Sequence, residues 1–377
     1  MATHGIAVSN LSKTFGRESV LTNVDLTVDP GEFCVVVGPS GCGKSTLLKC
    51  IAGLHDIDAG HVELDGRDVT TMPVRETNVG FVFQEFEHTL FPHKTVAENV
   101  AFGLEQQGDL TSEAIDDRVD SMLELLAIAE TRDDTPNELS GGQQQRVELA
   151  RQLVRDCETM LLDDPLADLD YKLQKRMELE LRRLHADSGS TYVYVTHNQE
   201  QALELADTLV VMNDGQIEQV GAPTEVYDRP ATAFVGRFVG DSNLFRSQLR
   251  NQNGEAVTVE TDVGEMTATT MARSKSLPDE SVTIVRPENA VLGEPGKANA
   301  FEGTLEGRTY TGERTEFTVA VPARDGIRRS LTVVEPGEAS AGNLHESVTV
   351  GWDATDAVYF DTISVTETTT IDDLEVL

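Results

Sequence analysis

A glycine-rich stretch at residues 38–45, which reads Gly-Pro-Ser-Gly-Cys-Gly-Lys-Ser, constrains this chain more than any other feature. It lies between an apolar run at 33–37 and a run with helical spacing at 46–52. Glycines let backbone N–H groups curl around phosphate oxygens, and the start of the following helix adds positive potential. A strand, this loop and a helix in that order predict a nucleotide-phosphate site in an α/β fold.

Two side chains of this stretch have the chemistry that a nucleotide needs. The Lys44 ammonium can reach the β- and γ-phosphates, and the Ser45 hydroxyl can coordinate Mg²⁺. Thr46 stands where a dinucleotide fingerprint needs its third glycine, so a dinucleotide site is not expected. An ordinary glycine-rich turn is the structural alternative. The residues expected to contact the nucleotide here are Gly38, Pro39, Ser40, Gly41, Cys42, Gly43, Lys44, Ser45 and Thr46.

The pattern of apolar residues and turns changes along the sequence, which predicts two domains. Residues 1–236 alternate apolar runs with helical patterns, which is typical of a parallel α/β sheet. Residues 241–377 hold short β-rich pieces separated by turns, which favours a small barrel or sandwich. The expected strands are 33–37, 79–83, 160–162, 192–195 and 209–212 in the first domain, and 256–260, 282–285, 301–305, 315–321, 348–352 and 357–360 in the second; the main expected helices are 111–129 and 173–186.

A second serine and glycine pair precedes another helical run, at 143–154. Ser140, Gly141 and Gly142 at a helix start would make a second anion-binding N-terminus. A capped helix with a glycine-rich approach is the structural alternative. Residues 139–143, Leu-Ser-Gly-Gly-Gln, resemble the signature of ABC ATPases. That resemblance implies that Ser140, Gly141, Gly142 and Gln143 contact a nucleotide bound by another copy of the chain.

Two carboxylates end the apolar run at 160–162. Residues 160–165 resemble the Walker B strand, in which Asp163 lies beside Mg²⁺. Asp164 stands where the family usually has glutamate, the base that positions the attacking water. Aspartate is one methylene shorter, and catalysis tolerates little displacement of a reacting group. Either the backbone compensates or hydrolysis is slow, and the presence of every other element favours an active ATPase.

Four further residues match positions of the same family. His197 matches the H-loop histidine, which contacts the γ-phosphate, and Gln84 matches the Q-loop glutamine, which reaches the metal and the attacking water. Asp170 matches the aspartate of the D-loop. Phe15 matches the aromatic residue that stacks on adenine, with packing in the core as the alternative.

The resemblance extends over nearly the whole chain and implies fold, cofactors and partners. It implies an ABC ATPase domain with a helical subdomain, followed by an OB-like regulatory domain, working as a head-to-tail homodimer with ATP and Mg²⁺. The stretch 90–104 is similar to importer ATPases, although the preceding link 85–89 is about two residues longer than usual. An importer subunit acts at the cytoplasmic face of the membrane, which it contacts only through two permease subunits, with an extracellular solute-binding protein as indirect partner.

The transported solute is less constrained. Residues 169–173 and 240–245 look closest to spermidine/putrescine importer ATPases, so a polyamine is the first expectation. Importers of sugar, ferric iron or sulfate-type anions remain alternatives. Two other classes stay open: a weakly hydrolysing, nucleotide-gated regulatory subunit, because Asp164 replaces glutamate, and a non-transport ABC protein acting on ribosomes or DNA.

Charge bears on these alternatives. The chain has 65 acidic and 30 basic residues and a formal net charge of −35, so clustered lysine and arginine for a nucleic-acid partner are not expected. Self-repulsion of this size destabilises a compact chain in dilute salt, whereas at about 1 M salt a Debye length of about 3 Å screens it. We therefore expect a salt-rich cytoplasm, with an acidic protein of an ordinary cell as the alternative. The four cysteines fit neither zinc nor disulfide patterns, which favours reduced thiols.

Overall fold

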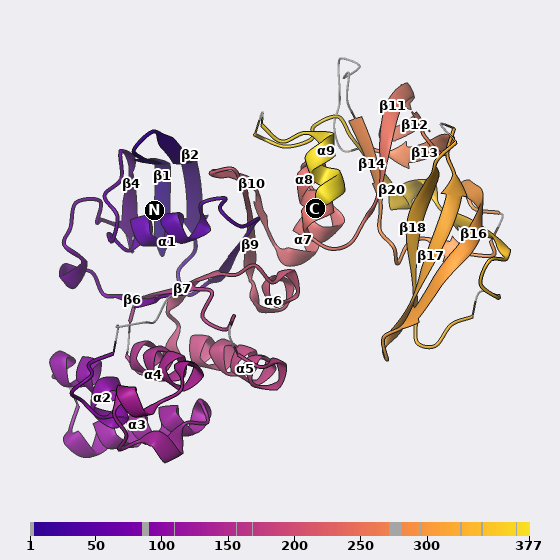
Figure 1. The fold of residues 1–377 in the computed structure, drawn as a ribbon. Helices are drawn as coiled ribbons and strands as arrows, with labels where there is room; N and C mark the ends of the chain where they lie inside the picture. Colours follow the sequence, from indigo (N-terminus) through magenta and orange to yellow (C-terminus); the bar gives the residue numbers. More distant parts are fainter. Residues whose placement is uncertain are drawn as a thin grey trace. The chain divides into compact units, whose positions relative to one another are not determined.

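The structure is a computed structural model of the 377-residue chain. It describes residues 4–84, 90–108, 110–155, 157–167, 169–270, 281–294, 296–324, 326–340, 342–366 and 368–377. The long link expected at 85–89 lies outside the described residues. Contacts divide the chain into two units, Met1–Thr224 and Glu225–Leu377. Figure 1 shows the elements of each unit.

A six-stranded sheet forms the centre of the first unit. Five strands run parallel in the order β9-β3-β8-β7-β6, and a sixth, β10, pairs antiparallel with β9. All residues of β3, β7 and β8 are buried, as expected for parallel strands covered on both faces. Each strand predicted for this domain is present. The bounds are β3 (Phe33–Val37), β6 (Val79–Val82), β7 (Thr159–Asp163), β8 (Thr191–Val195), β9 (Thr208–Asn213) and β10 (Gln216–Gly221).

A second, antiparallel sheet in this unit was not predicted. Its order is β2-β1-β4-β5, and its buried side chains join those of α1 and of the parallel sheet in one core. In Figure 1 the helix α1 lies beside this sheet. The bounds are β1 (Ile6–Phe15), β2 (Glu18–Val28), β4 (Ala59–Leu64), β5 (Arg67–Asp68) and α1 (Lys44–Ile51).

Three helices gather into the helical subdomain that the resemblance implied (Figure 1). Thr95 and Glu98 form a reciprocal capping box at the start of α2, which fixes where that helix begins. The predicted helix 111–129 ends earlier, since Ala127 adopts a left-handed φ of 52° that a helix cannot contain. The bounds are α2 (Val96–Gln107), α3 (Ser112–Leu125), α4 (Gly141–Leu153), α5 (Tyr171–Ser188) and α6 (Gln199–Leu205), with short 3₁₀ turns at Val74–Glu76, Ala129–Thr131 and Pro136–Glu138.

The second unit combines a closed barrel, β11-β12-β13-β20-β14, with a five-stranded sheet, β15-β19-β16-β17-β18. Both contribute to one apolar core that includes Phe245 and Trp352. The all-β character was predicted, whereas β11, β13, β15 and β18 were not. The bounds are β11 (Asn243–Asn253), β12 (Ala256–Thr261), β13 (Glu265–Thr269), β14 (Ser281–Val285), β15 (Val291–Leu292), β16 (Asn299–Tyr310), β17 (Arg314–Pro322), β18 (Arg328–Pro336), β19 (Ser347–Trp352) and β20 (Ala357–Phe360).

The predicted first domain, 1–236, includes most of a helix whose contacts lie in the second unit. α8 (Ala233–Phe238) packs on β14, and a Cβ on its Gly236 would touch Ile284 and Phe360 of the barrel. It therefore belongs with the second unit, which α7 (Pro223–Asp228) leads into and α9 (Ile371–Val376) ends. None of the helices in the described part of the chain has the length and apolar character of a membrane span.

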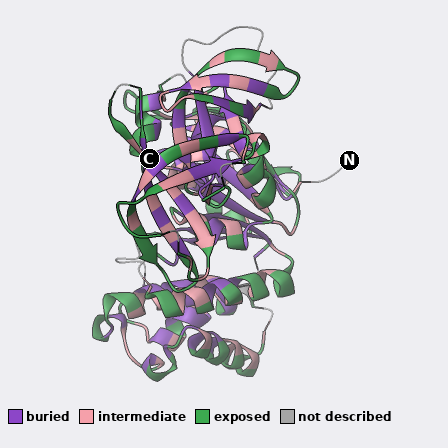
Figure 2. Ribbon diagram, turned by 90° about the vertical axis from the view of Figure 1, so that its right-hand side faces the viewer, coloured by how far each residue is buried: buried purple, intermediate pink, exposed green. Residues whose placement is uncertain are grey.

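Burial follows the sheets. Figure 2 shows buried residues concentrated in the strands and exposed residues along the outer faces of the helices. All four cysteines are buried and none is in a disulfide.

Candidate functional site

The site lies at the carboxyl-terminal edge of the parallel sheet. Val36 of β3 and Asp163 of β7 both pair with Val195 of β8. The segments that follow these three strands therefore emerge side by side. Ligands of open α/β sheets bind at this edge. The register thus brings together the phosphate loop, the two carboxylates and His197, which are far apart in the sequence.

The phosphate loop needs its glycines for steric reasons. A Cβ on Gly38 would lie 2.3 Å from the Met212 carbonyl oxygen and 2.6 Å from Cys42 Sγ. Gly43 caps α1 with a left-handed φ of 103°, which only glycine adopts readily. The Lys44 ammonium donates to the carbonyl oxygens of Gly38 and Pro39, at 2.7 and 2.9 Å. The loop is thus a tight turn with a cation folded across it, at the start of a helix.

A hydroxyl at the start of α1 contacts a carboxylate at the end of β7. Ser45 Oγ donates to Asp163 Oδ1 at 2.7 Å, across 118 residues of sequence. Burial raises the pKa of Asp163, while the bond from Ser45 and the nearby Lys49 act in the opposite direction. Two hard oxygen donors in contact fit Mg²⁺, the metal expected here. The predicted metal ligands Ser45 and Asp163 are therefore neighbours.

The second carboxylate contacts the histidine directly. Asp164 Oδ2 and His197 Nδ1 are 2.6 Å apart, so Nδ1 carries the hydrogen in this bond and Nε2 remains available. Asp164 adopts φ 48°, unusual for a residue other than glycine, and its backbone N–H donates to the Val195 carbonyl at 2.9 Å. The sharp turn at the end of β7 aims this shorter side chain at the histidine. Asp164 is 8% exposed, whereas the His197 side chain is 65% exposed.

A buried polar group behind Asp164 was missed by the sequence analysis. Thr196 Oγ1 is 2.9 Å from Gln201 Oε1 and 3.4 Å from Asp164 Oδ1. Tyr194 Oη donates to the same Gln201 oxygen at 3.4 Å. Burial, and then the charge of Asp164, raise the pKa of Tyr194, so it stays a donor. The only signal in the sequence was that Thr196 directly precedes His197.

The Ser140 segment forms the start of α4. The Ser140 hydroxyl and the Gln143 side chain cap each other's backbone N–H groups, so the helix start is pre-formed. Ser140, Gly141 and Gly142 are exposed. A Cβ at Gly141 or Gly142 would meet nothing within 4 Å. In the described part of the chain, no crowding requires glycine at these two positions.

Three other predicted residues lie just past β6, at the start of α5 and at the end of β1. Gln84 is exposed just past β6. Asp170 caps α5, accepting a hydrogen bond from the Leu173 N–H at 3.1 Å. Phe15 ends β1 and is 44% exposed, which rules out packing in the core. Its ring makes an edge contact with the His55 ring, with 5.3 Å between the centroids, and Lys13 Nζ lies 5.2 Å from the centre of the Phe15 ring.

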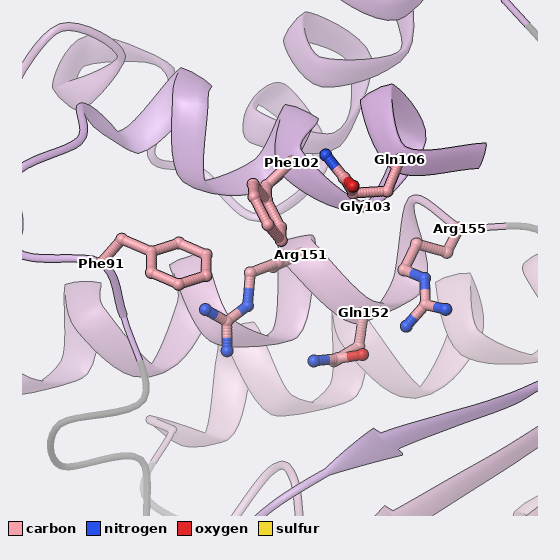
Figure 3. A pocket seen from close by; sticks show the side chains of 7 residues that line it. All are labelled: Phe91, Phe102, Gly103, Gln106, Arg151, Gln152 and Arg155. Carbon is pink, nitrogen blue, oxygen red and sulfur yellow. The ribbon is translucent and has the colours of Figure 1, made fainter. Parts of the chain in front are cut away.

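A pocket of about 460 Å³ opens in the helical subdomain. Figure 3 shows arginine and glutamine side chains from the α4 region facing aromatic and glutamine side chains from the α2 side. The Arg151 guanidinium lies 5.5 Å from the centre of the Phe91 ring. A Cβ on Gly103 would lie 2.6 Å from Arg155 Cδ, so this glycine makes room for the arginine stem. The lining residues are Phe91, Phe102, Gly103, Gln106, Arg151, Gln152 and Arg155.

Two parts of the chain match known families. Residues 21–167 match the ABC transporter family, and residues 283–360 match the TOBE domain. The first match includes the phosphate loop, the signature segment and both carboxylates. The second lies within the barrel and sheet of the second unit.

Relatives match over most of their length. The chain is 41% identical to a spermidine/putrescine import ATP-binding protein of Aliivibrio fischeri, covering 92% of this chain and 93% of the relative. It is 41% identical to a protein of the same description from Trichormus variabilis, over 91% and 89%. A Fe(3+) ions import ATP-binding protein of Brucella abortus is 38% identical over 92% and 94%.

A solved structure is also similar. The dimeric, post-hydrolysis state of the ATP-binding cassette MJ0796 bound to ADP and Pi is 32% identical, with a TM-score of 0.54. The match covers 58% of this chain and 98% of that one.

Proposed function

This chain belongs to the ATP-binding proteins of ABC transporters, and we propose that it is the ATP-hydrolysing subunit of an importer, acting at the cytoplasmic face of the membrane. The chain is therefore an ABC ATPase with a C-terminal TOBE domain. One observation supports the full proposal best: the pre-formed start of α4 carries two glycines that no neighbour among the described residues requires. An exposed, positively polarised helix start suits a phosphate brought by a second copy.

The residues at the sheet edge have distinct tasks in this proposal. The Lys44 ammonium, held by the loop carbonyls of Gly38 and Pro39, turns to the β- and γ-phosphates of ATP. Phe15 offers an exposed face for stacking on adenine. Asp164 accepts a proton from the attacking water, and His197 contacts the γ-phosphate. In the closed homodimer, Ser140, Gly141, Gly142 and Gln143 of the partner contact the same phosphate.

Mg²⁺ is the cofactor in this proposal. Ser45 and Asp163 hold it, with Gln84 as the third protein ligand. When bound, it neutralises charge on the phosphates. The buried carboxylate of Asp163, whose pKa is raised by burial, gains a counter-charge there.

Two permeases are the membrane partners, and the pocket lined by Phe91, Phe102, Arg151 and Arg155 is their proposed docking site. It adjoins the stretch 90–104, by which the chain resembles importer ATPases. Its lining has two aromatic rings and two arginines, of which Arg151 pairs with the buried Glu148 just outside the lining, in a chain of net charge −35. Such a pocket suits an amphipathic segment with an acidic side chain. An extracellular solute-binding protein would then act through the permeases.

The solute is proposed to be a polyamine. The relatives from Aliivibrio fischeri and Trichormus variabilis are described as spermidine/putrescine import proteins, whereas that from Brucella abortus is described for ferric ions. Uptake of labelled spermidine in cells lacking this gene tests the choice. Uptake should be lost, return with the wild-type gene, and stay absent with Lys44→Ala. Normal spermidine uptake with loss of ferric iron uptake would identify the alternative solute.

The ATPase dimer is tested with the purified full-length chain. The Asp164→Asn protein in Mg²⁺ and ATP should run as a dimer in analytical ultracentrifugation, and as a monomer without nucleotide. A protein that binds ATP yet stays monomeric at every concentration would overturn the proposed two-chain site.

A weakly hydrolysing regulatory subunit remains the second candidate, because Asp164 replaces the usual glutamate. The 2.6 Å contact between Asp164 and His197 favours an active site instead, since the turn at φ 48° brings the shorter side chain to the histidine. ATPase assays across a salt series separate the two. Tight ATP binding without turnover at any salt concentration would support the regulatory function.

A further inference from the structure

Asp164 has one oxygen engaged by His197 and one that faces a buried hydroxyl. Oδ2 binds the histidine at 2.6 Å, whereas Oδ1 lies 3.4 Å from Thr196 Oγ1. Thr196 is 0% exposed, so water does not reach its hydroxyl. Its only hydrogen has two acceptors within reach, and the nearer one, at 2.9 Å, is Gln201 Oε1.

We propose that Thr196 and Gln201 are positioning residues for Asp164, with Thr196 supplying the second hydrogen bond of the carboxylate and Gln201 holding the hydroxyl in place for it. The inference rests on the proposed ATPase function. When Oδ2 turns from His197 to the attacking water, the carboxylate loses its 2.6 Å partner. The Thr196 hydroxyl then rotates its hydrogen from Gln201 to Asp164 Oδ1.

The rest of the group makes Thr196 rigid enough for this task. Thr196 Oγ1 accepts a hydrogen bond from the Asn198 N–H at 3.0 Å, and its own N–H donates to the Val36 carbonyl at 3.2 Å. These bonds fix the hydroxyl oxygen relative to both β3 and the start of α6. The backbone of Asp164 already turns its short carboxylate, and the fixed Thr196 hydroxyl would hold that carboxylate in one position. A longer glutamate would need less support from its neighbours.

Gln201 has to be neutral for the exchange to work. It is 2% exposed, and its oxygen accepts from both Thr196 and Tyr194. An amide oxygen holds a hydroxyl with a neutral hydrogen bond, roughly half as strong as one to a carboxylate. Gln201 Oε1 is the nearer acceptor in this structure, and the charged Asp164 becomes the stronger one once Oδ2 has left His197. A carboxylate at position 201 would keep the hydrogen, and would add a second negative charge to a buried group.

Steady-state ATPase assays on the full-length chain test this inference. Thr196→Val keeps the shape and removes the hydroxyl; kcat should fall between about ten- and a hundredfold, with KM for ATP within about twofold. Thr196→Ser keeps the hydroxyl and should stay within about threefold of wild type. Gln201→Glu should lower kcat as well, because a charged acceptor retains the hydrogen.

A matched control comes from β8, the strand that ends just before Thr196. Thr191 is 3% exposed on β8, and its hydroxyl accepts from the Gly31 N–H at 3.0 Å, away from the site. Thr191→Val should lower the unfolding midpoint comparably and leave kcat unchanged. If Thr196→Val does not fold, Gln201→Glu carries the test, because it retains the hydroxyl and changes only its acceptor.

A double-mutant cycle separates positioning from structural support. In an Asp164→Asn background, Thr196→Val should cost little further activity in single-turnover assays, because the group it positions is already gone. A full additional loss in that background, wild-type kcat in Thr196→Val, or no rescue by Thr196→Ser would each overturn the inference. A wild-type chain without any ATPase activity would refute the proposed function instead.

Discussion

The two glycine-lined helix starts of this chain differ in how much of their surroundings the chain itself supplies. At the start of α1 the glycines are required by neighbours: a Cβ on Gly38 would collide with the Met212 carbonyl, and one on Gly43 with Val20 and Leu21. At the start of α4, Gly141 and Gly142 face open space. Both starts have the polarity that binds anions, but only the first is enclosed by its own chain.

This difference shows that a glycine with open space around it can indicate a binding surface, just as a glycine with close neighbours indicates tight packing. Glycine costs a helix up to about 1 kcal/mol relative to alanine. At Gly141 and Gly142 no contact within the described residues offsets that cost. The close approach of another molecule is what would make glycine necessary there, as the two-chain site requires.

The largest expected effect comes from disabling the enclosed helix start. Lys44→Ala removes the ammonium group held over the loop by Gly38 and Pro39, and ATPase activity should fall by more than about a thousandfold, since no other charge of the loop replaces it. ATP binding should weaken in parallel, as measured by calorimetry. Lys172→Ala, on the exposed face of α5, is the control and should behave as wild type.

Asp164→Asn should abolish most hydrolysis while nucleotide still binds at both helix starts. The amide no longer accepts a proton, so kcat should fall between about a hundred- and a thousandfold, while ATP still binds. The ATP-bound protein should accumulate as a dimer, with each α4 start closed on nucleotide. Wild-type turnover in this variant would show that Asp164 is not the base.

A pair of alanine substitutions tests the comparison itself. Gly142→Ala should leave the unfolding free energy unchanged or raise it by up to about 1 kcal/mol, yet lower ATPase activity about ten- to a hundredfold by obstructing the partner's phosphate. Gly38→Ala should instead cost about 1–3 kcal/mol of stability through overpacking. Denaturation curves and ATPase rates on both proteins are needed. Equal stability losses in the two would remove the distinction.

Phe15→Ala is expected to act on affinity alone. Loss of the exposed ring should raise KM for ATP about three- to tenfold, with kcat nearly unchanged, because stacking contributes about 1 kcal/mol. Phe15→Trp should retain most of the affinity. A fall in kcat without a change in KM would assign the ring another task.

Salt should affect the contact of the α4 start with nucleotide more than nucleotide binding at the α1 start. Two copies of net charge −35 must approach each other for the α4 start to meet nucleotide, so dimer formation should strengthen as KCl rises. The unfolding midpoint should rise with KCl too. Full stability and full dimerisation at low salt would contradict the expectation of a salt-rich cytoplasm.

Much of the fold and site could be predicted from local sequence. The phosphate loop, the signature segment and the buried strands β3, β7 and β8 depend on short stretches whose residue types fix local conformation. The antiparallel sheet of β1, β2, β4 and β5 escaped notice, since its strands alternate buried and exposed positions with several irregularities in pairing. Likewise, α8 could not be assigned to the second unit without its contacts to β14.

The sequence alone determined that this chain has two glycine-rich helix starts, two adjacent carboxylates and a following histidine, because each motif is contiguous and its local geometry follows from glycine, polarity and spacing. Only the tertiary structure decided how these meet. The parallel register of β7 and β8 puts Asp164 against His197 and Thr196, some thirty residues further along, and no local property encodes that register. Backbone pairing between distant segments set it, together with the left-handed turn that aims the shorter carboxylate.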